Sequence, residues 1–249
     1  MKVLGLVLAF MLLASVAFAD TITNYTSGAG DGFVYWSSYD VTTWAQLHDA
    51  VDGTSYDYVS GGGAGYYNAR TTWYSGLFSR IDRGFFPIDT SGIADDDTIT
   101  SAVLYIHIFD KGATDNDEYS YIGIVQTSQA ATNALATTDY DQSGTYDAGH
   151  ITIDNIVDTL HNGTGNGWNA FSLDATGIGW INKTGWTLLG TREGHDLTNN
   201  AILTTKTNYV ECYFSENATY KPYLQVTTTT AGGGTGFSVD PTNRAIFTN

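Results

Sequence analysis

The chain has 249 residues, a formal net charge of −16 at pH 7 and 14% aromatic residues. So acidic a surface repels nucleic acid and anionic membranes, which excludes both as expected partners. Cys212 is the only cysteine. An internal disulfide is therefore excluded, and the fold must be held by its core, which a single β-domain of this length can bury.

The first 19 residues have the pattern of a secretory signal peptide. Lys2 precedes an apolar run over residues 3–16, and Ala17-Phe18-Ala19 predicts cleavage after Ala19. An uncleaved anchor is the alternative, but the run is shorter than the ~20 residues that span a bilayer. Cleavage removes Lys2 and no acid, so the net charge changes from −16 to −17. We expect a secreted, extracellular protein with no membrane insertion after cleavage.

The segment that follows the signal peptide predicts a strand and then a helix. Residues 21–40 have the alternation of an extended strand. Residues 43–51 form the best helical stretch, since Thr43 can cap it and Trp44 and Leu47 lie on one face. So short a helix must pack on the rest of the fold. We therefore expect Trp44 to fill the core rather than to contact a ligand.

Aromatic residues alternate with glycines over residues 55–79. Two strands, near 57–60 and 71–77, can flank a hairpin loop at 61–65. An aromatic ring beside mobile glycine can stack on the C–H face of a sugar, and a neighbouring polar group can bind its hydroxyls. Packing of the same rings across strands is the alternative. The candidate carbohydrate contacts are Tyr66, Tyr67, Arg70, Trp73 and Tyr74.

Residues 83–110 carry the strongest strand signal in the chain. Strands are expected over 84–88 and 98–109, joined by a turn that contains Gly92. In the second strand, alternate residues from 102 to 108 form one apolar face and those from 103 to 109 form another. With both faces largely apolar, this strand is expected inside a sandwich rather than at its edge.

Four segments carry a family resemblance over roughly residues 75–228. The first reads RGFFPIDTSGIADDDTITSAVL from Arg83, and the later ones read FSLDATGIGWINKTG, GTREGHDL and FSE…KPYLQVT. Together they resemble the DNRLRE-type domain, a family related to carbohydrate-binding modules of the alginate-binding type. The resemblance implies a secreted β-sandwich and assigns no catalytic residue.

Further strands are expected over the second half of the chain. They begin near Ile151 and cover 168–173, 186–191, 209–214 and 224–226, and a helical turn is expected at 176–182. Cys212 alternates with polar neighbours, which favours a small buried hydrophobe over an intermolecular disulfide. After residue 228 the composition changes to a Gly/Thr-rich linker and tail over 229–249. That tail can be disordered, can add to a sheet edge or can be donated to another subunit.

Two kinds of polar cluster have residues that can bind a metal ion or act in acid–base catalysis. The acidic turns at 95–97 and 115–118 can offer oxygen ligands to Ca²⁺, but they lack EF-hand spacing, which favours solvated turns without a cofactor. The segment Arg192-Glu-Gly-His-Asp196 is the densest polar cluster. The segment resembles a strand and loop of the same family, and we expect a structural role in which Arg192 pairs with a carboxylate and His195 braces a loop. An acid–base pair or a metal site is the alternative.

These patterns predict an all-β fold, an antiparallel β-sandwich of the jelly-roll type with one short helix, over residues 20–228. We expect a non-catalytic carbohydrate-binding or adhesive module whose partner is an extracellular polysaccharide or cell-surface glycan. A structural subunit of an extracellular layer, filament or matrix, which self-assembles through the tail, is the main alternative. A polysaccharide-degrading enzyme is a third possibility, but the sequence holds no recognised catalytic motif.

Overall fold

A computed structural model describes residues 20–40, 43–58, 67–74, 78–162, 167–203 and 205–230. Four features that the sequence analysis singled out lie outside these residues: the signal peptide 1–19, the loop at 61–65, Tyr66 and the tail from residue 231.

Over the described residues the chain forms twelve strands, connected mostly by antiparallel pairing. They are β1 (Asp20–Thr26), β2 (Gly32–Ser38), β3 (Ser55–Asp57), β4 (Tyr67–Trp73), β5 (Ser79–Asp89), β6 (Asp97–Ala113), β7 (Tyr121–Gln126), β8 (His150–Thr152), β9 (Trp168–Ser172), β10 (Trp186–Glu193), β11 (Lys206–Cys212) and β12 (Tyr223–Thr230). The antiparallel all-β sandwich predicted from the alternation is confirmed.

The helices of the described chain are all short. They are α1 (Trp44–His48), α2 (Thr159–Asn162), α3 (Ala175–Gly179) and α4 (Gly194–Thr198), together with the 3₁₀ helices η1 (Thr137–Gln142) and η2 (Ile153–Asn155). The sequence analysis expected one helix, which is α1, and a helical turn where α3 forms. Helix α4 forms where a loop was expected after the strand at 186–191.

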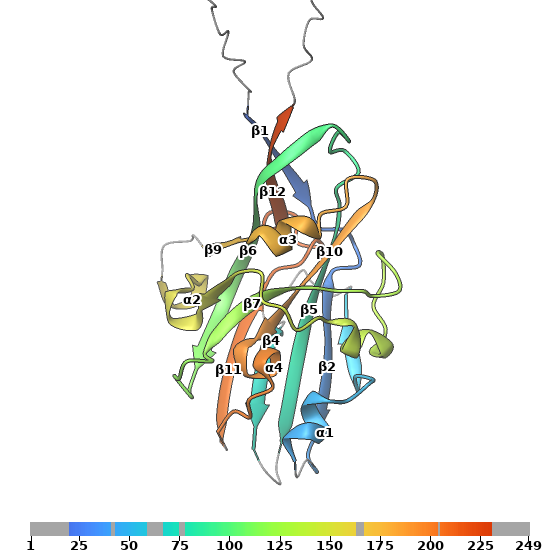
Figure 1. The fold of residues 1–249 in the computed structure, drawn as a ribbon. Helices are drawn as coiled ribbons and strands as arrows, with labels where there is room; N and C mark the ends of the chain where they lie inside the picture. The colour runs from blue at the N-terminus through green and yellow to red at the C-terminus, as the bar shows by residue number, and fades with distance from the viewer. Residues whose placement is uncertain are drawn as a thin grey trace, which may run out of the picture.

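Strand β6 joins the two parts of the sandwich. It pairs with β12 from Asp97 to Tyr105 and with β11 from Ile108 to Ala113, while β9 pairs with its other edge. As Figure 1 shows, this long strand runs from the end of the molecule where β1 and β12 lie to the end where β4 and β11 lie. The predicted interior position of this strand is confirmed.

The main core lies between the sheets and comes from the predicted apolar faces. Phe86, Leu104, Ile124, Phe171 and Leu224 are each at most 1% exposed. Burying a side chain of this size contributes about 1.5–3 kcal/mol. Cys212 belongs to the same core at 2% exposure, as expected for a small buried hydrophobe.

A second, smaller core lies beneath α1 and η1. Leu47 of α1 and Tyr140 of η1 are fully buried there, together with Ile81 and Phe85 of β5. The Tyr140 hydroxyl donates to the Leu47 carbonyl at 3.0 Å. Trp44 packs against this second core, as the sequence analysis predicted. The two short helices are therefore held by burial against β5 rather than by their own length.

Candidate functional site

The five predicted carbohydrate contacts differ in how well they are placed to meet a ligand. Tyr66 lies outside the described residues, and Tyr67 begins β4 opposite Glu211. The Arg70 Nε donates to the Thr72 hydroxyl at 2.8 Å. Tyr74 follows β4, and its amide donates to the carbonyl of Phe78.

Trp73, the fourth of these predicted contacts, stacks on Trp44 with ring centroids 5.6 Å apart and an interplanar angle of 11°. One face of its ring is therefore covered by α1. This packing connects α1 to β4 and leaves less ring surface for a sugar. A role for these five residues in binding stays a prediction.

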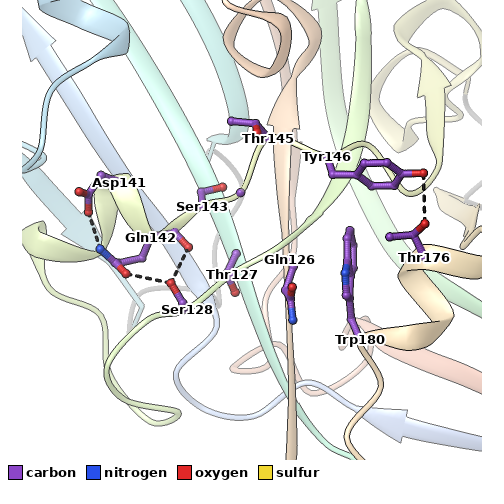
Figure 2. Close-up of a pocket in the computed structure, with 11 residues that line it drawn as sticks. Gln126, Thr127, Ser128, Asp141, Gln142, Ser143, Thr145, Tyr146, Thr176 and Trp180 are labelled. Atoms are coloured by element: carbon purple, nitrogen blue, oxygen red, sulfur yellow. Dashed lines mark hydrogen bonds between the residues drawn. The ribbon is translucent and has the colours of Figure 1, made fainter.

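An open cavity of about 570 Å³ lies between the end of β7, the η1 region and α3. We call it the Trp180 groove. Its lining residues are mostly uncharged and polar, with two aromatic rings (Figure 2): Gln126, Thr127, Ser128, Asp141, Gln142, Ser143, Gly144, Thr145, Tyr146, Thr176 and Trp180.

The aromatic end of the groove is built by α3 and the loop that faces it. Asp174 caps α3 by accepting from the Gly177 amide at 2.8 Å, which places Trp180 directly after the helix. Tyr146 meets Trp180 edge to face, with ring centroids 6.0 Å apart and an interplanar angle of 87°. The Tyr146 hydroxyl donates to Asp174 at 2.8 Å, so one carboxylate both starts the helix and orients the ring.

These two hydrogen bonds also act on the capping carboxyl. The bond from the Gly177 amide, and then the bond from the Tyr146 hydroxyl, lower the pKa of Asp174. Asp174 is therefore ionised over the ordinary pH range, and the orientation of Tyr146 does not depend on its titration there.

The polar end of the groove is a hydrogen-bonded row (Figure 2). The Ser128 hydroxyl donates to the Gln142 side-chain oxygen at 2.8 Å, and the Gln142 amide donates to Asp141 at 2.6 Å. The Ser143 hydroxyl oxygen is buried and has no hydrogen-bond partner among the described residues.

A buried ion network contacts the loop that lines the groove. Arg83 of β5 and Arg192 of β10 both reach Asp196 of α4, and we call these three residues the arginine network. Arg83 donates from Nε at 3.0 Å and from Nη2 at 2.7 Å, and Arg192 from Nε at 2.6 Å and from Nη2 at 2.8 Å. Asp196 is fully buried and the two arginines are at most 3% exposed.

The remaining arginine donors reach backbone carbonyls of neighbouring segments. Arg83 donates to the carbonyls of His48 and Tyr140, and Arg192 donates to the Gly144 carbonyl at 3.1 Å. The network therefore connects α1, η1 and the groove loop to the sheet. Burial raises the pKa of Asp196, but Arg192 and Arg83 outweigh it and hold that pKa well below its ordinary value.

A second polar cluster lies on the other side of the same segment. It contains Asp115, Asp117, Glu193 and His195, and we call it the histidine cluster. The His195 Nδ1 lies 2.9 Å from Glu193 Oε1, and its Nε2 lies 3.2 Å from Asp117 Oδ2 and 3.4 Å from Asp115 Oδ2. The side chains of Asp115 and His195 are each 1% exposed, while that of Asp117 is 39% exposed.

These contacts bear on the predicted role of residues 192–196. The expectation that Arg192 pairs with a carboxylate and that His195 braces a loop is confirmed. The strand expected over 186–191 extends to Glu193, and α4 begins at Gly194, where Glu193 caps it by accepting from the His195 amide at 3.0 Å. A Cβ at Gly194 would lie 2.2 Å from the Tyr119 carbonyl oxygen, so close backbone approach requires glycine.

The Trp180 groove was not found by sequence reasoning. The helical turn expected at 176–182 contains Trp180, which packs on the main core as well as lining the groove. Tyr146 stands in a long polar connection between strands. The one local signal was an aromatic residue in a segment rich in Ser, Thr, Gly and Asp.

Comparison with known proteins adds no assignment: no family model and no curated protein matches this chain. The resemblance to the DNRLRE-type domain therefore stays a prediction. Within the described part of the chain, none of the helices has the length and apolar character needed to cross a membrane.

Proposed function

We propose that this protein is a secreted, non-catalytic carbohydrate-binding module and that the Trp180 groove is its binding surface. The observation that carries the proposal is the placement of Trp180 and Tyr146 beside the row of Ser128, Gln142 and Asp141. A sugar offers C–H faces that stack on aromatic rings and hydroxyls that bind amide and carboxylate oxygens.

The charge of the groove indicates which glycans it suits. Among its eleven lining residues there is no Lys or Arg, and Asp141 carries the one formal charge. A polyanion such as alginate would meet the Asp141 carboxylate and an acidic protein surface, with no basic group in the groove to bind it. We therefore propose a neutral polysaccharide or a neutral cell-surface glycan as the ligand.

The same residues support binding rather than hydrolysis. Glycoside hydrolases ordinarily use two carboxyl groups that flank the scissile bond. The Trp180 groove is lined by a single carboxylate, Asp141, whose side chain accepts from Gln142.

The test is affinity electrophoresis of the purified protein against neutral and anionic polysaccharides. Trp180→Ala should weaken retardation by a neutral glycan at least tenfold, which corresponds to about 1.4 kcal/mol. Trp186→Ala is the matched control, because Trp186 is 37% exposed but does not line the groove. Unchanged binding by Trp180→Ala would exclude the Trp180 groove as the site. Loss only in Trp73→Ala and Tyr74→Ala would favour the surface predicted from the sequence.

A structural subunit is the second candidate, and one feature of the sheet favours it. β1 stands at the end of the strand order and pairs with β12 alone among the described strands. An unpaired sheet edge can accept a strand from another copy of the chain. Deleting residues 231–249 should then abolish assembly measured by light scattering, and an unchanged oligomer distribution would count against this candidate.

A further inference from the structure

The histidine cluster gathers more negative charge than the chain itself balances. Asp115, Asp117 and Glu193 surround the single imidazole of His195. No Lys or Arg among the described residues forms an ion pair with these carboxylates. The Lys206 ammonium donates to the Thr114 carbonyl at 2.8 Å rather than to one of these acids.

The hydrogen bonds around His195 leave one ring nitrogen facing only acceptors. Its Nδ1 lies within hydrogen-bond distance of the buried Glu193 carboxylate, which favours the tautomer with the proton on Nδ1. As an imidazolium, His195 can donate its Nε2–H to Asp117 Oδ2, with Asp115 Oδ2 also close. That single positive charge balances only one of the three carboxylates, whereas a divalent ion in place of the Nε2 proton would balance two.

A second observation points to a ligand at the same place. Asp115 Oδ2 accepts from the Leu203 amide at 3.0 Å, but Asp115 Oδ1 is buried and has no hydrogen-bond partner among the described residues. A buried carboxylate oxygen without a donor carries an uncompensated desolvation cost. A bound metal ion would remove that cost.

We propose that Asp115, Asp117 and His195 bind a divalent first-row transition-metal ion, with Zn²⁺ as the representative case. One ligand atom from each of the three side chains can lie within 4.8 Å of both others, which suits a shared ion. Two carboxylates and one imidazole favour Zn²⁺ over Ca²⁺, which prefers an all-oxygen set.

Glu193 has a separate, positioning role in this site. Metal-ligating histidines almost always donate their other ring N–H to a carboxylate or a carbonyl, and Glu193 is placed to accept it. Glu193 is itself held by the Asn208 amide at 3.0 Å and by the His195 amide. The imidazole therefore has a fixed ring orientation before any ion arrives.

The backbone also brings the two aspartates to one side of the loop. Asn116, between them, has a φ of 54°, in the left-handed region that Asn adopts more readily than most residues. The loop 114–120 thus faces α4 with both carboxylates. A metal ion here would connect this loop to the segment that also carries the arginine network.

Another group with similar composition, Asp110, Asp158 and His161, is the competing candidate. Its Asp158 Oδ2 is likewise buried without a hydrogen-bond partner among the described residues. The group is less suited to an ion because the His161 side chain is 59% exposed and both Asp110 oxygens already accept hydrogen bonds, from the Lys111 amide and the Tyr209 hydroxyl. The experiment must therefore distinguish the two groups.

The test is calorimetric titration of chelator-treated protein with Zn²⁺, followed by thermal unfolding with and without the ion. We expect one equivalent to bind and to raise Tm, since an ion that binds only the folded state stabilises it. Asp117→Asn should weaken binding at least tenfold and remove the rise in Tm. Glu118→Gln is the matched control, because it changes the charge by the same amount at the next residue, which is exposed.

Each outcome supports or overturns the proposal. Retained binding in Glu118→Gln and in His161→Ala, with loss in Asp117→Asn, supports it. Three results overturn it: no binding of Zn²⁺ to the wild type, equal binding by Asp117→Asn, or loss of binding in His161→Ala. Tight binding of Ca²⁺ and not of Zn²⁺ overturns the metal class. Circular dichroism spectra that match the wild type show that each variant is folded.

Discussion

The arginine network and the histidine cluster share the segment 192–196, and both bury carboxylates. They differ in the positive charge that the chain places beside those carboxylates. In the network, one buried carboxylate, that of Asp196, meets two guanidinium groups. In the cluster, three carboxylates meet one imidazole. Glu193 and Asp196 are three residues apart, yet one lies beside a histidine and the other between arginines.

The difference shows what burial of charge requires. Removing a carboxylate from water costs several kcal/mol, which only close opposite charge and complete hydrogen bonding can offset. The arginine network achieves this within the chain, and its spare donors also bind the carbonyls of α1, η1 and the groove loop. The histidine cluster does not, and for this reason we infer an external cation there.

The largest expected effect is in the arginine network. Asp196→Asn keeps the size of the side chain but leaves two buried guanidinium groups without a counter-charge. We expect the free energy of unfolding, measured by urea denaturation, to fall by about 3–5 kcal/mol. A loss below about 1 kcal/mol would show that the network is not a main source of stability.

A milder variant keeps the test informative if Asp196→Asn does not fold. Arg192→Lys preserves the charge but removes the planar fork that contacts both Asp196 oxygens. We expect a loss of about 1–2 kcal/mol, as for one or two hydrogen bonds.

A third buried carboxylate, Asp31, extends the comparison, because it has neither arginine nor histidine beside it. It accepts from the Ser215 amide at 2.9 Å and from the Ser215 hydroxyl at 2.7 Å, and it is 0% exposed. Burial raises the pKa of Asp31 to about 7, against which the Ser215 bonds act only in part. Glu216 and the buried thiol of Cys212 are its nearest ionisable neighbours.

The sign of the resulting pH dependence follows from linkage. The pKa of Asp31 in the folded protein lies above the ordinary value of 3.8. Protonated Asp31 therefore stabilises the folded protein fully at pH values below 3.8, and this stabilisation is lost as the pH rises from there through the folded pKa. The wild type should lose about 2 kcal/mol between pH ~5 and pH ~7 relative to Asp31→Asn, which does not titrate. Parallel stability curves for the two proteins over this range would contradict the raised pKa.

A smaller effect is expected at Tyr140, which lies between the network and the second core. Its ring lies 4.0 Å below the Arg83 guanidinium, and its hydroxyl donates to the Leu47 carbonyl. Tyr140→Phe keeps the ring and should cost about 1 kcal/mol in urea denaturation, the contribution of one buried hydrogen bond. Tyr39→Phe, at a residue that is 72% exposed, is the control and should be neutral.

The sequence predicted the sandwich well because strand formation leaves a local trace. Alternation from residue 98 to 109 identifies β6 and its two faces, and Trp44 and Leu47 identify the buried side of α1. These are properties of neighbouring residues. Burial of one face is enough to set the register of such a strand.

The sites could not be predicted in the same way, because their members are far apart in the chain. Asp115 and His195 come together only after β6 pairs with β11 and β7 pairs with β10. Tyr146 meets Trp180 only once α3 is in place. The pair Arg192 and Asp196 has the spacing of neighbours on a helix, but a segment that resembles a strand and loop gives no local reason to expect the two side chains in contact.

The smallest expected effect, and the most direct test of the contrast, is the stability of Asp117→Asn in the presence of a chelator. If the histidine cluster lacks a counter-charge of its own, removing one of its carboxylates relieves repulsion. The free energy of unfolding should then equal that of the wild type or exceed it by about 0.5 kcal/mol. Asp196→Asn, with the same chemical change in the arginine network, should behave in the opposite way.

Adding Zn²⁺ should make the wild type more stable than Asp117→Asn, since only the wild type gains stability from a bound ion. If Asp117→Asn instead costs more than about 1 kcal/mol in chelator, the His195 imidazolium alone balances the cluster. In that case the chain itself would balance the buried carboxylates on both sides of α4, and no external cation would be needed.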